Sequence, residues 1–192
     1  MGTPVGFSEH GIVGARDGDG SGERFRAAEP LWQGHMGARR LYENLPREQW
    51  DGYRKFATVR NPFDRALSRF FYRHRISGGQ PFGNFDAARA AFAAYLLDDP
   101  PPNDRYVVHL SGICVLDDVI RFERIEDDVQ RIAGRLNLGQ IMGALPHARA
   151  NPGVRFGRSV ADFFCKATVD AVRRADDWMF ALGHYSTDPR DA

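Results

Sequence analysis

The stretch that most constrains the fold of this chain is FATVRNPFDRALSRFFYRH, which starts at Phe56 and joins a short apolar run to a helical pattern. The run ends at Arg60 and is short and bounded, as a strand covered on both faces of a sheet would be. Asn61 and Pro62 then suit the N-cap and the first position of a helix, and Asp64 places a carboxylate at the positive end of its dipole. Apolar residues recur after this start at helical spacing: Phe63, Leu67, Phe70 and Phe71. The sequence therefore predicts a strand that ends where a helix begins, with an arginine at the junction.

Strands and helices alternate along the rest of the chain. Further helices are predicted over residues 36–45, 85–99, 126–138 and 168–182, and further strands at residues 107–108 and 115–123. In the third of these helices one face carries Val129, Ile132 and Leu136. This order is typical of an α/β domain with a mainly parallel sheet. We expect residues 1–28, which are rich in glycine and charge, to be flexible or irregular, and residues 29–192 to form one domain.

The composition limits the kinds of partner and compartment. The formal net charge is +1, and Lys55 and Lys166 are the only lysines among 26 basic residues. Arginine suits bidentate contacts to phosphate and carboxylate groups, although such usage can also reflect the source genome. Cys114 and Cys165 stand in apolar settings, so we expect two buried free thiols in a reducing compartment rather than a disulfide or a metal site. No apolar run is long enough to span a bilayer.

Arg60 and Ser68 are the first candidate site residues. In open parallel sheets ligands bind outside the carboxyl ends of the strands, and Arg60 stands at such an end. Ser68 follows eight residues later, in the second turn of the predicted helix. The two side chains could share an anion, and the alternative is a surface arginine and a helix serine with no joint role.

The same stretch resembles the 3′-phosphate-binding motif of sulfotransferases that use 3′-phosphoadenosine 5′-phosphosulfate (PAPS), in particular the carbohydrate sulfotransferases of the family 2 type. That motif has an apolar strand, Val-Arg, Asn or Asp, Pro, and then Arg and Ser at short intervals. The residues that match it in order are Val59, Arg60, Asn61, Pro62, Arg65 and Ser68. The resemblance implies a three-layer, P-loop-kinase-like α/β fold, in which Arg60 and Ser68 hold the 3′-phosphate. Arg65 could contact the ligand or hold a neighbouring acid.

Two later segments resemble the family in order and distance. DDVIRFERIEDDVQ is similar to a strand that ends in an aromatic-Glu pair before an acidic helix, and Phe122 and Glu123 take those places. The ring of Phe122 could stack on adenine or belong to the core. LPHARANPGVRFGRS is similar to the late loop that closes over the nucleotide, and it matches Asn151 and Arg155.

The resemblance implies a transfer of the sulfuryl group from PAPS, without a metal, to a hydroxyl of a carbohydrate or glycolipid acceptor. This transfer needs a general base, and His35 lies where several relatives that sulfate sugars have a catalytic histidine. A structural histidine that caps the following helix is the alternative. Weaker candidates for the base are His109, His147, Glu9 and Glu29. We expect a bacterial protein that is cytoplasmic or peripheral to the membrane.

One part of the family pattern is not visible in this sequence. The family fold starts with a strand and a Pro-Lys-Thr-x-x-Thr-Ser loop that holds the 5′-phosphosulfate, whereas the first lysine here is Lys55. Either the chain begins downstream of that unit, or the unit has been lost or replaced. A second hypothesis is therefore a truncated or degenerate sulfotransferase-like protein that binds adenosine 3′,5′-bisphosphate or a partner without catalysis. A nucleic-acid-binding module is a third, weaker hypothesis, disfavoured by the net charge; it would use the arginines at positions 65, 69, 73 and 75.

Overall fold

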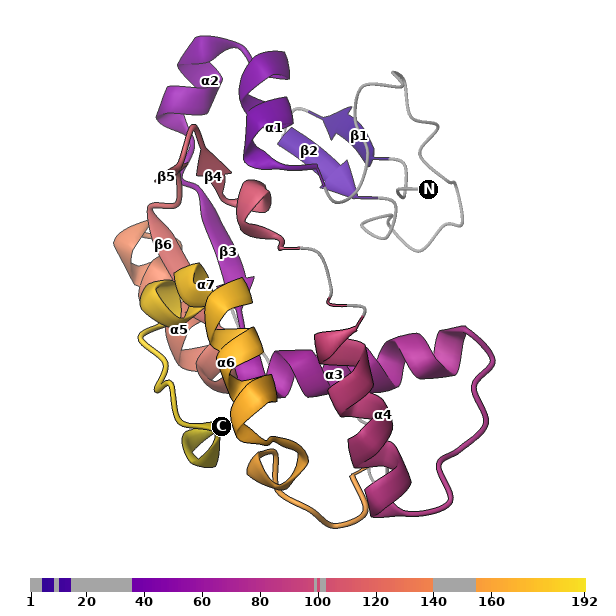
Figure 1. Ribbon diagram of the computed structural model, residues 1–192. Coiled ribbons are helices and arrows are strands. Elements are labelled where there is room, and N and C mark those ends of the chain that lie inside the picture. The colour runs from indigo at the N-terminus through magenta and orange to yellow at the C-terminus, as the bar shows by residue number, and fades with distance from the viewer. Residues whose placement is uncertain (1–4, 9–10, 15–35, 99, 101–102, 140–154) are drawn as a thin grey trace, which may run out of the picture. The chain divides into compact units, whose positions relative to one another are not determined.

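The computed structural model describes residues 5–8, 11–14, 36–98, 100, 103–139 and 155–192. The chain divides into two compact units. Unit 1 comprises residues up to Lys55 together with residues 104–116, and unit 2 comprises residues 56–103 and 117–192. The sequence analysis did not predict this division, because it placed its only boundary near residue 28. The fold is mixed α/β, as predicted at the level of class (Figure 1).

The described residues of unit 1 form two antiparallel hairpins and two short helices. Strands β1 (Val5–Ser8) and β2 (Gly11–Gly14) pair with each other, inside the segment predicted to be irregular. Helices α1 (Ala38–Asn44) and α2 (Arg47–Gly52) follow, and α1 contacts the second hairpin, whose strands are β4 (His109–Leu110) and β5 (Ile113–Cys114). The predicted strand at residues 107–108 is wrong, because Val107 belongs to the 3₁₀ turn η1 (Arg105–Val107), Val108 lies in the turn that follows, and β4 begins only at His109.

Within the described residues, the sheet of unit 2 is small. Strands β3 (Phe56–Val59) and β6 (Asp118–Arg121) form a two-stranded parallel sheet. The prediction that β3 is covered on both faces is wrong, because Phe56 is 49% exposed and only Val59 is buried. The parallel pairing itself agrees with the sequence analysis. The three-layer, P-loop-kinase-like fold that the sulfotransferase resemblance implies stays a prediction.

The core of unit 2 is built by three helices that contact one another: α3 (Pro62–Ile76), α4 (Phe85–Leu97) and α6 (Lys166–Ala175). Asn61 caps α3, because its Oδ1 accepts a hydrogen bond from the backbone N–H of Phe63 at 3.0 Å, and Asn84 caps α4 in the same way. The buried residues of this core are largely aromatic or aliphatic: Phe63, Ala66, Leu67, Phe70, Ala88, Phe92, Leu96, Val160, Phe163, Phe164, Val172 and Phe180. Burial of this cluster fixes α3, and therefore the position of the residues at its first turns.

The other helices of unit 2 lie at the end of the sheet and towards the C-terminus. The turn η2 (Phe122–Arg124) leads from β6 into α5 (Ile125–Arg135). On the predicted apolar face, Ile132 is buried, but Leu136, which follows the last residue of α5, is 36% exposed. The helix predicted over residues 168–182 is two helices, because the backbone leaves the helical conformation at Asp176 between α6 and α7 (Asp177–Gly183). Two 3₁₀ turns complete the unit, η3 (Ala161–Phe163) and η4 (Pro189–Asp191).

The predicted burial of both cysteines is wrong. Both thiols are free, but Cys165 is exposed and Cys114 is only partly buried. Cys165 lies at the N-cap of α6, while the two phenylalanines before it fill the core in its place. The thiol accepts hydrogen bonds from the backbone N–H and from the hydroxyl of Thr168. These bonds, of which the one from the backbone has the larger effect, lower the pKa of Cys165 below its ordinary value.

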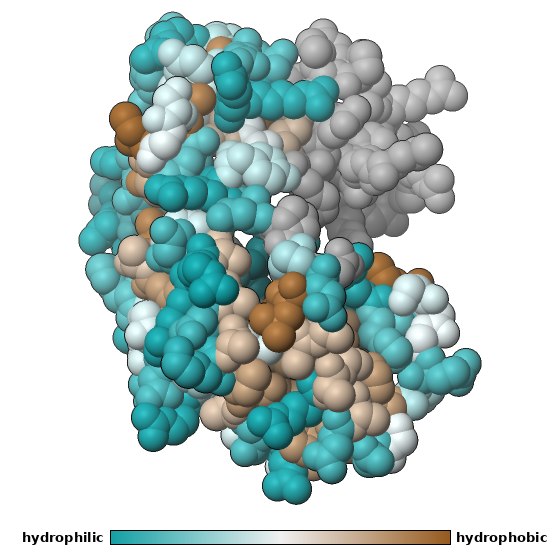
Figure 2. All heavy atoms as spheres, viewed as in Figure 1, coloured by the Kyte–Doolittle hydropathy of each residue, from teal (hydrophilic) through white to brown (hydrophobic). Residues whose placement is uncertain are grey.

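The surface is largely polar on the face in Figure 2. Hydrophilic residues cover most of this face, and apolar residues gather over the lower part, where the alanine-rich helix α4 lies. No helix within the described ranges is long and apolar enough to cross a membrane.

Candidate functional site

The carboxyl ends of the two parallel strands bring Arg60 beside Phe122. Val59 pairs with Arg121 in the register of β3 and β6, so the next residue of each strand is Arg60 and Phe122 respectively. The guanidinium carbon of Arg60 lies 4.6 Å from the centre of the Phe122 ring, a cation–π contact. Phe122 is 50% exposed, so its interpretation as a core residue is wrong. The ring forms an exposed platform against the arginine.

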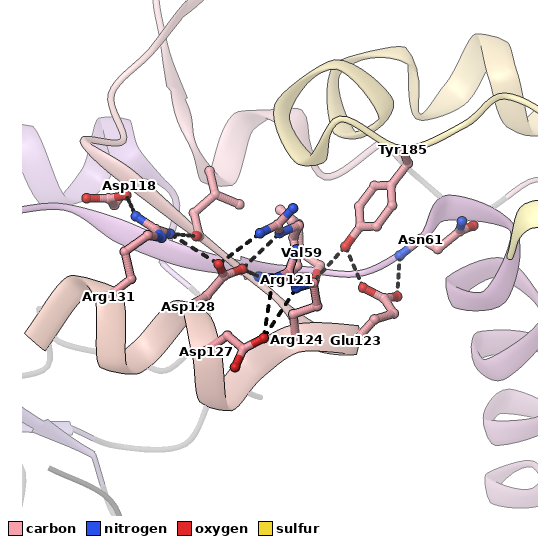
Figure 3. Close-up of polar contacts among 11 residues, drawn as sticks. Val59, Asn61, Asp118, Arg121, Glu123, Arg124, Asp127, Asp128, Arg131 and Tyr185 are labelled. Carbon is pink, nitrogen blue, oxygen red and sulfur yellow. Dashed lines mark hydrogen bonds and ion pairs between the residues drawn. The ribbon is translucent and has the colours of Figure 1, made fainter. Parts of the chain in front are cut away.

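Glu123 ties the start of α3 to the C-terminal segment, as Figure 3 shows. Its Oε1 accepts a hydrogen bond from the backbone N–H of Asn61 at 2.8 Å, and its Oε2 accepts one from the hydroxyl of Tyr185 at 2.6 Å. Burial, followed by the bond to Glu123, raises the pKa of Tyr185 well above its ordinary value. The Tyr185 hydroxyl also lies 3.4 Å from the carbonyl oxygen of Val59. Glu123 therefore has a structural role at this junction, because both of its oxygens are engaged.

Arg60 contacts two side chains on one face of α3. Its Nε donates to Asp64 Oδ2 at 2.5 Å, and its Nη2 contacts the same oxygen. Its Nη1 donates to Ser68 Oγ at 3.2 Å. Asp64 and Ser68 are one turn apart on the helix, so both can face one guanidinium group. Arg60 and Ser68 are therefore in direct contact, while their joint binding of an anion stays a prediction.

Arg155 meets the same carboxylate from a distant part of the sequence. Its Nη2 donates to Asp64 Oδ1 at 2.5 Å, so the two oxygens of Asp64 are each bound by a different arginine. The structure thus brings together all three residues assigned to the nucleotide: Arg60, Ser68 and Arg155. The sequence analysis gave Asp64 only a role at the helix dipole. Asp64 lies four residues after Arg60 and four before Ser68, and this spacing could have indicated that its carboxylate contacts Arg60.

The charges and exposure of this cluster suit an anion. Two guanidinium groups and one carboxylate leave a net charge of +1, and the positive end of α3 lies at the same place. The side chains of Arg60 and Arg155 are 27% and 35% exposed, so both can be reached by a ligand. A guanidinium group has five N–H donors, which leaves Arg60 with donors beyond those that bind Asp64 and Ser68. The cluster can therefore accept hydrogen-bonding oxygens from an anion.

A second ionic cluster holds β6 against α5 (Figure 3). The buried carboxylate of Asp128 accepts hydrogen bonds from the backbone N–H of Arg121 at 2.8 Å and from its Nε and Nη2 at 2.9 and 3.0 Å. The bonds from Arg121 hold the pKa of Asp128 well below its usual range. Arg131 extends the cluster to Asp118, at 2.5 Å. This cluster fixes the end of β6, directly before the exposed ring of Phe122.

Other residues named from the sequence lie elsewhere or outside the described ranges. His35, the proposed base, lies outside them, as do Asn151 and the weaker candidates His147, Glu9 and Glu29. His109 belongs to unit 1, where its Nδ1 lies 3.0 Å from the carbonyl oxygen of Arg105. Of the two roles open to Arg65, the structure shows the contact to an acid, because its Nη1 lies 3.2 Å from both oxygens of Asp176.

No protein-family model, curated protein or solved structure matches the chain. The sulfotransferase family therefore stays a prediction from the residues of the strand-helix junction. Within the described residues, no group of three or more His, Cys, Asp or Glu side chains could hold a metal ion. The contacts around Arg60 are therefore the main structural indication of function.

Proposed function

We propose that the chain is a PAPS-dependent sulfotransferase, which transfers a sulfuryl group to a hydroxyl of a carbohydrate or glycolipid acceptor. One observation supports this most: Arg60 and Arg155 converge on one face of α3, and Arg60 reaches Ser68 Oγ at 3.2 Å. Charged donors that approach one point from different segments suit a phosphate group. In this proposal Arg60, Ser68 and Arg155 bind the 3′-phosphate of the nucleotide.

The exposed ring of Phe122 supports a nucleotide in particular. It lies at the carboxyl end of β6, against Arg60, where an adenine or ribose could pack on it while the phosphate meets the arginine. Aromatic rings commonly hold nucleobases by stacking. His35 would act as the general base of the transfer, taking the proton of the acceptor hydroxyl.

Transfer of labelled sulfate from PAPS to a panel of sugars and glycolipids tests this function. We expect product with wild-type protein and a large loss of rate with Arg60→Ala, because the donor would bind poorly. Arg39→Ala is the matched control, since Arg39 lies in an exposed surface pair with Glu43 in unit 1. Equal rates for Arg60→Ala and wild type would contradict the proposal.

A second candidate is a protein that binds adenosine 3′,5′-bisphosphate without catalysis. One feature of the sequence favours it: no Pro-Lys-Thr motif for the 5′-phosphosulfate is present. The two candidates differ in one result. The binder shows affinity for the nucleotide but transfers no sulfate to any acceptor, whereas the enzyme shows both.

A further inference from the structure

Asp64 occupies the point at which the two candidate phosphate-binding arginines meet. Its Oδ2 is bound by Arg60 and its Oδ1 by Arg155, so one carboxylate bridges two guanidinium groups. A phosphate group would use two of its oxygens in the same way. The carboxylate of Asp64 and a bound phosphate would therefore compete for the same N–H donors of Arg60 and Arg155.

The contacts of the two arginines are not equivalent. Arg60 is held by two nitrogens on Asp64 and by a third on Ser68, and its side chain is 27% exposed. Arg155 contacts Asp64 through Nη2 and is 35% exposed. Release of Arg155 from Asp64 breaks fewer contacts than release of Arg60 does. Arg155 is therefore the arginine that can exchange Asp64 for a phosphate oxygen.

The charge of the cluster also favours the release of Asp64 from an arginine when a phosphate binds. A phosphate monoester carries close to two negative charges at neutral pH. The cluster of two arginines and one aspartate offers a net charge of +1, which leaves an excess of negative charge in the complex. Asp64 would then lie beside the phosphate, and like charges at contact distance oppose binding.

We infer that Asp64 is an internal competitor of the phosphate ligand, and that a phosphate monoester displaces it from Arg155 on binding. Asp64 thereby limits the affinity of the site for the nucleotide and keeps the arginines paired in the free protein. It is a positioning residue, which acts through Arg155 and Arg60. The inference depends on the proposed nucleotide site and adds to it a residue that sets its affinity.

The test is calorimetric titration of adenosine 3′,5′-bisphosphate into the full chain at low ionic strength. Asp64→Asn keeps the shape of the side chain and removes its charge, and we expect it to bind the ligand about tenfold more tightly than wild type. Asp170→Asn is the matched control, because it removes one carboxylate from the surface pair with Lys166 and leaves the site intact. Asp64→Ser is measured as well, so that the comparison remains if Asp64→Asn fails to fold.

A double-mutant cycle separates competition from a merely structural role. If Asp64 acts by holding Arg155, the gain from Asp64→Asn shrinks in the Arg155→Gln background, because the arginine to be released is gone. A structural effect of Asp64 on the helix would persist unchanged in that background.

Each result bears on the inference or on the proposed function. Tighter binding by Asp64→Asn, dependent on Arg155, supports the inference, including the case in which only the variant binds detectably. Wild-type binding with equal or weaker binding by Asp64→Asn overturns the inference and leaves the nucleotide site in place, since Asp64 would then orient the arginines for the ligand. Failure of wild type and of both Asp64 variants to bind at millimolar ligand overturns the nucleotide site itself.

Discussion

Replacing the buried carboxylate of Asp128 should lower the stability of unit 2 by far more than replacing its exposed neighbour. The Asp128 side chain is 3% exposed and accepts three hydrogen bonds from Arg121 at 2.8 to 3.0 Å. Asp128→Asn would leave the guanidinium group of Arg121 in place without its counter-charge. Because the side chain of Arg121 is itself 31% exposed, the loss of these charged hydrogen bonds should cost about 1.5 to 3 kcal/mol of unfolding free energy.

Asp127→Asn is the matched control, because it changes the same type of residue one position away. Asp127 is 70% exposed and meets Arg124 at 3.3 Å. An exposed pair of this kind contributes less than about 1 kcal/mol. Urea denaturation followed by circular dichroism gives the free energy of unfolding of wild type and both variants. The reasoning is refuted if Asp128→Asn loses no more stability than Asp127→Asn.

The pH dependence gives the same prediction a second readout. Because the pKa of Asp128 is lower in the folded protein than in the unfolded chain, its stabilising effect is present above the unfolded pKa, which is about 3.9. The effect is lost as the pH falls below that value. The difference in unfolding free energy between wild type and Asp128→Asn should therefore be constant near neutral pH and narrow below about pH 4.

Three further predictions concern the contacts around the site. Tyr185→Phe removes the hydrogen bond to Glu123 and should cost about 1 to 2 kcal/mol of unfolding free energy. Because the pKa of Tyr185 is raised in the folded protein, absorbance titration of wild type should show this phenol still protonated when exposed tyrosines ionise. The free energy of unfolding should accordingly fall as the pH rises above about 10, where the same phenol ionises in the unfolded chain. Asp176→Asn should cost about 1 to 3 kcal/mol by urea denaturation, since it removes the negative charge that Nη1 of the partly buried Arg65 contacts at 3.2 Å. Cys165 should react with iodoacetamide faster than the other cysteine, as peptide mapping would show, because its thiol is exposed and its pKa is lowered.

The sequence predicted the start of α3 well, because there a side chain bonds to its own backbone neighbours. Asn61 and Pro62 define the start of α3 within the chain itself, and the structure has the helix at that place. The break at Asp176 carried no such signal, since no glycine or proline marks it. At this break, the backbone of Asp176 is not helical, and its carboxylate contacts Arg65, which lies 111 residues away in the sequence.

The candidate site shows the same division between local and distant contacts. The pairing of Arg60 with Ser68 was predictable because both positions lie within eight residues. Arg155 meets Asp64 from 91 residues away; the resemblance assigned Arg155 to the nucleotide, but nothing in the sequence indicated its contact with Asp64. The exposure of Phe122 also depends on tertiary structure, because an aromatic residue after a strand can as well end in the core.

The central claim is that Arg60 binds the 3′-phosphate of a nucleotide. Calorimetric titration of adenosine 3′,5′-bisphosphate into wild type and Arg60→Ala tests it most directly, with Arg39→Ala as the control for the loss of one positive charge. We predict that wild type and Arg39→Ala bind alike, and that Arg60→Ala binds about ten- to a hundredfold more weakly, the effect of removing a charged hydrogen-bonding group. Equal affinity of Arg60→Ala and wild type would contradict the claim, as would a failure of wild type and of both Asp64 variants to bind at millimolar ligand.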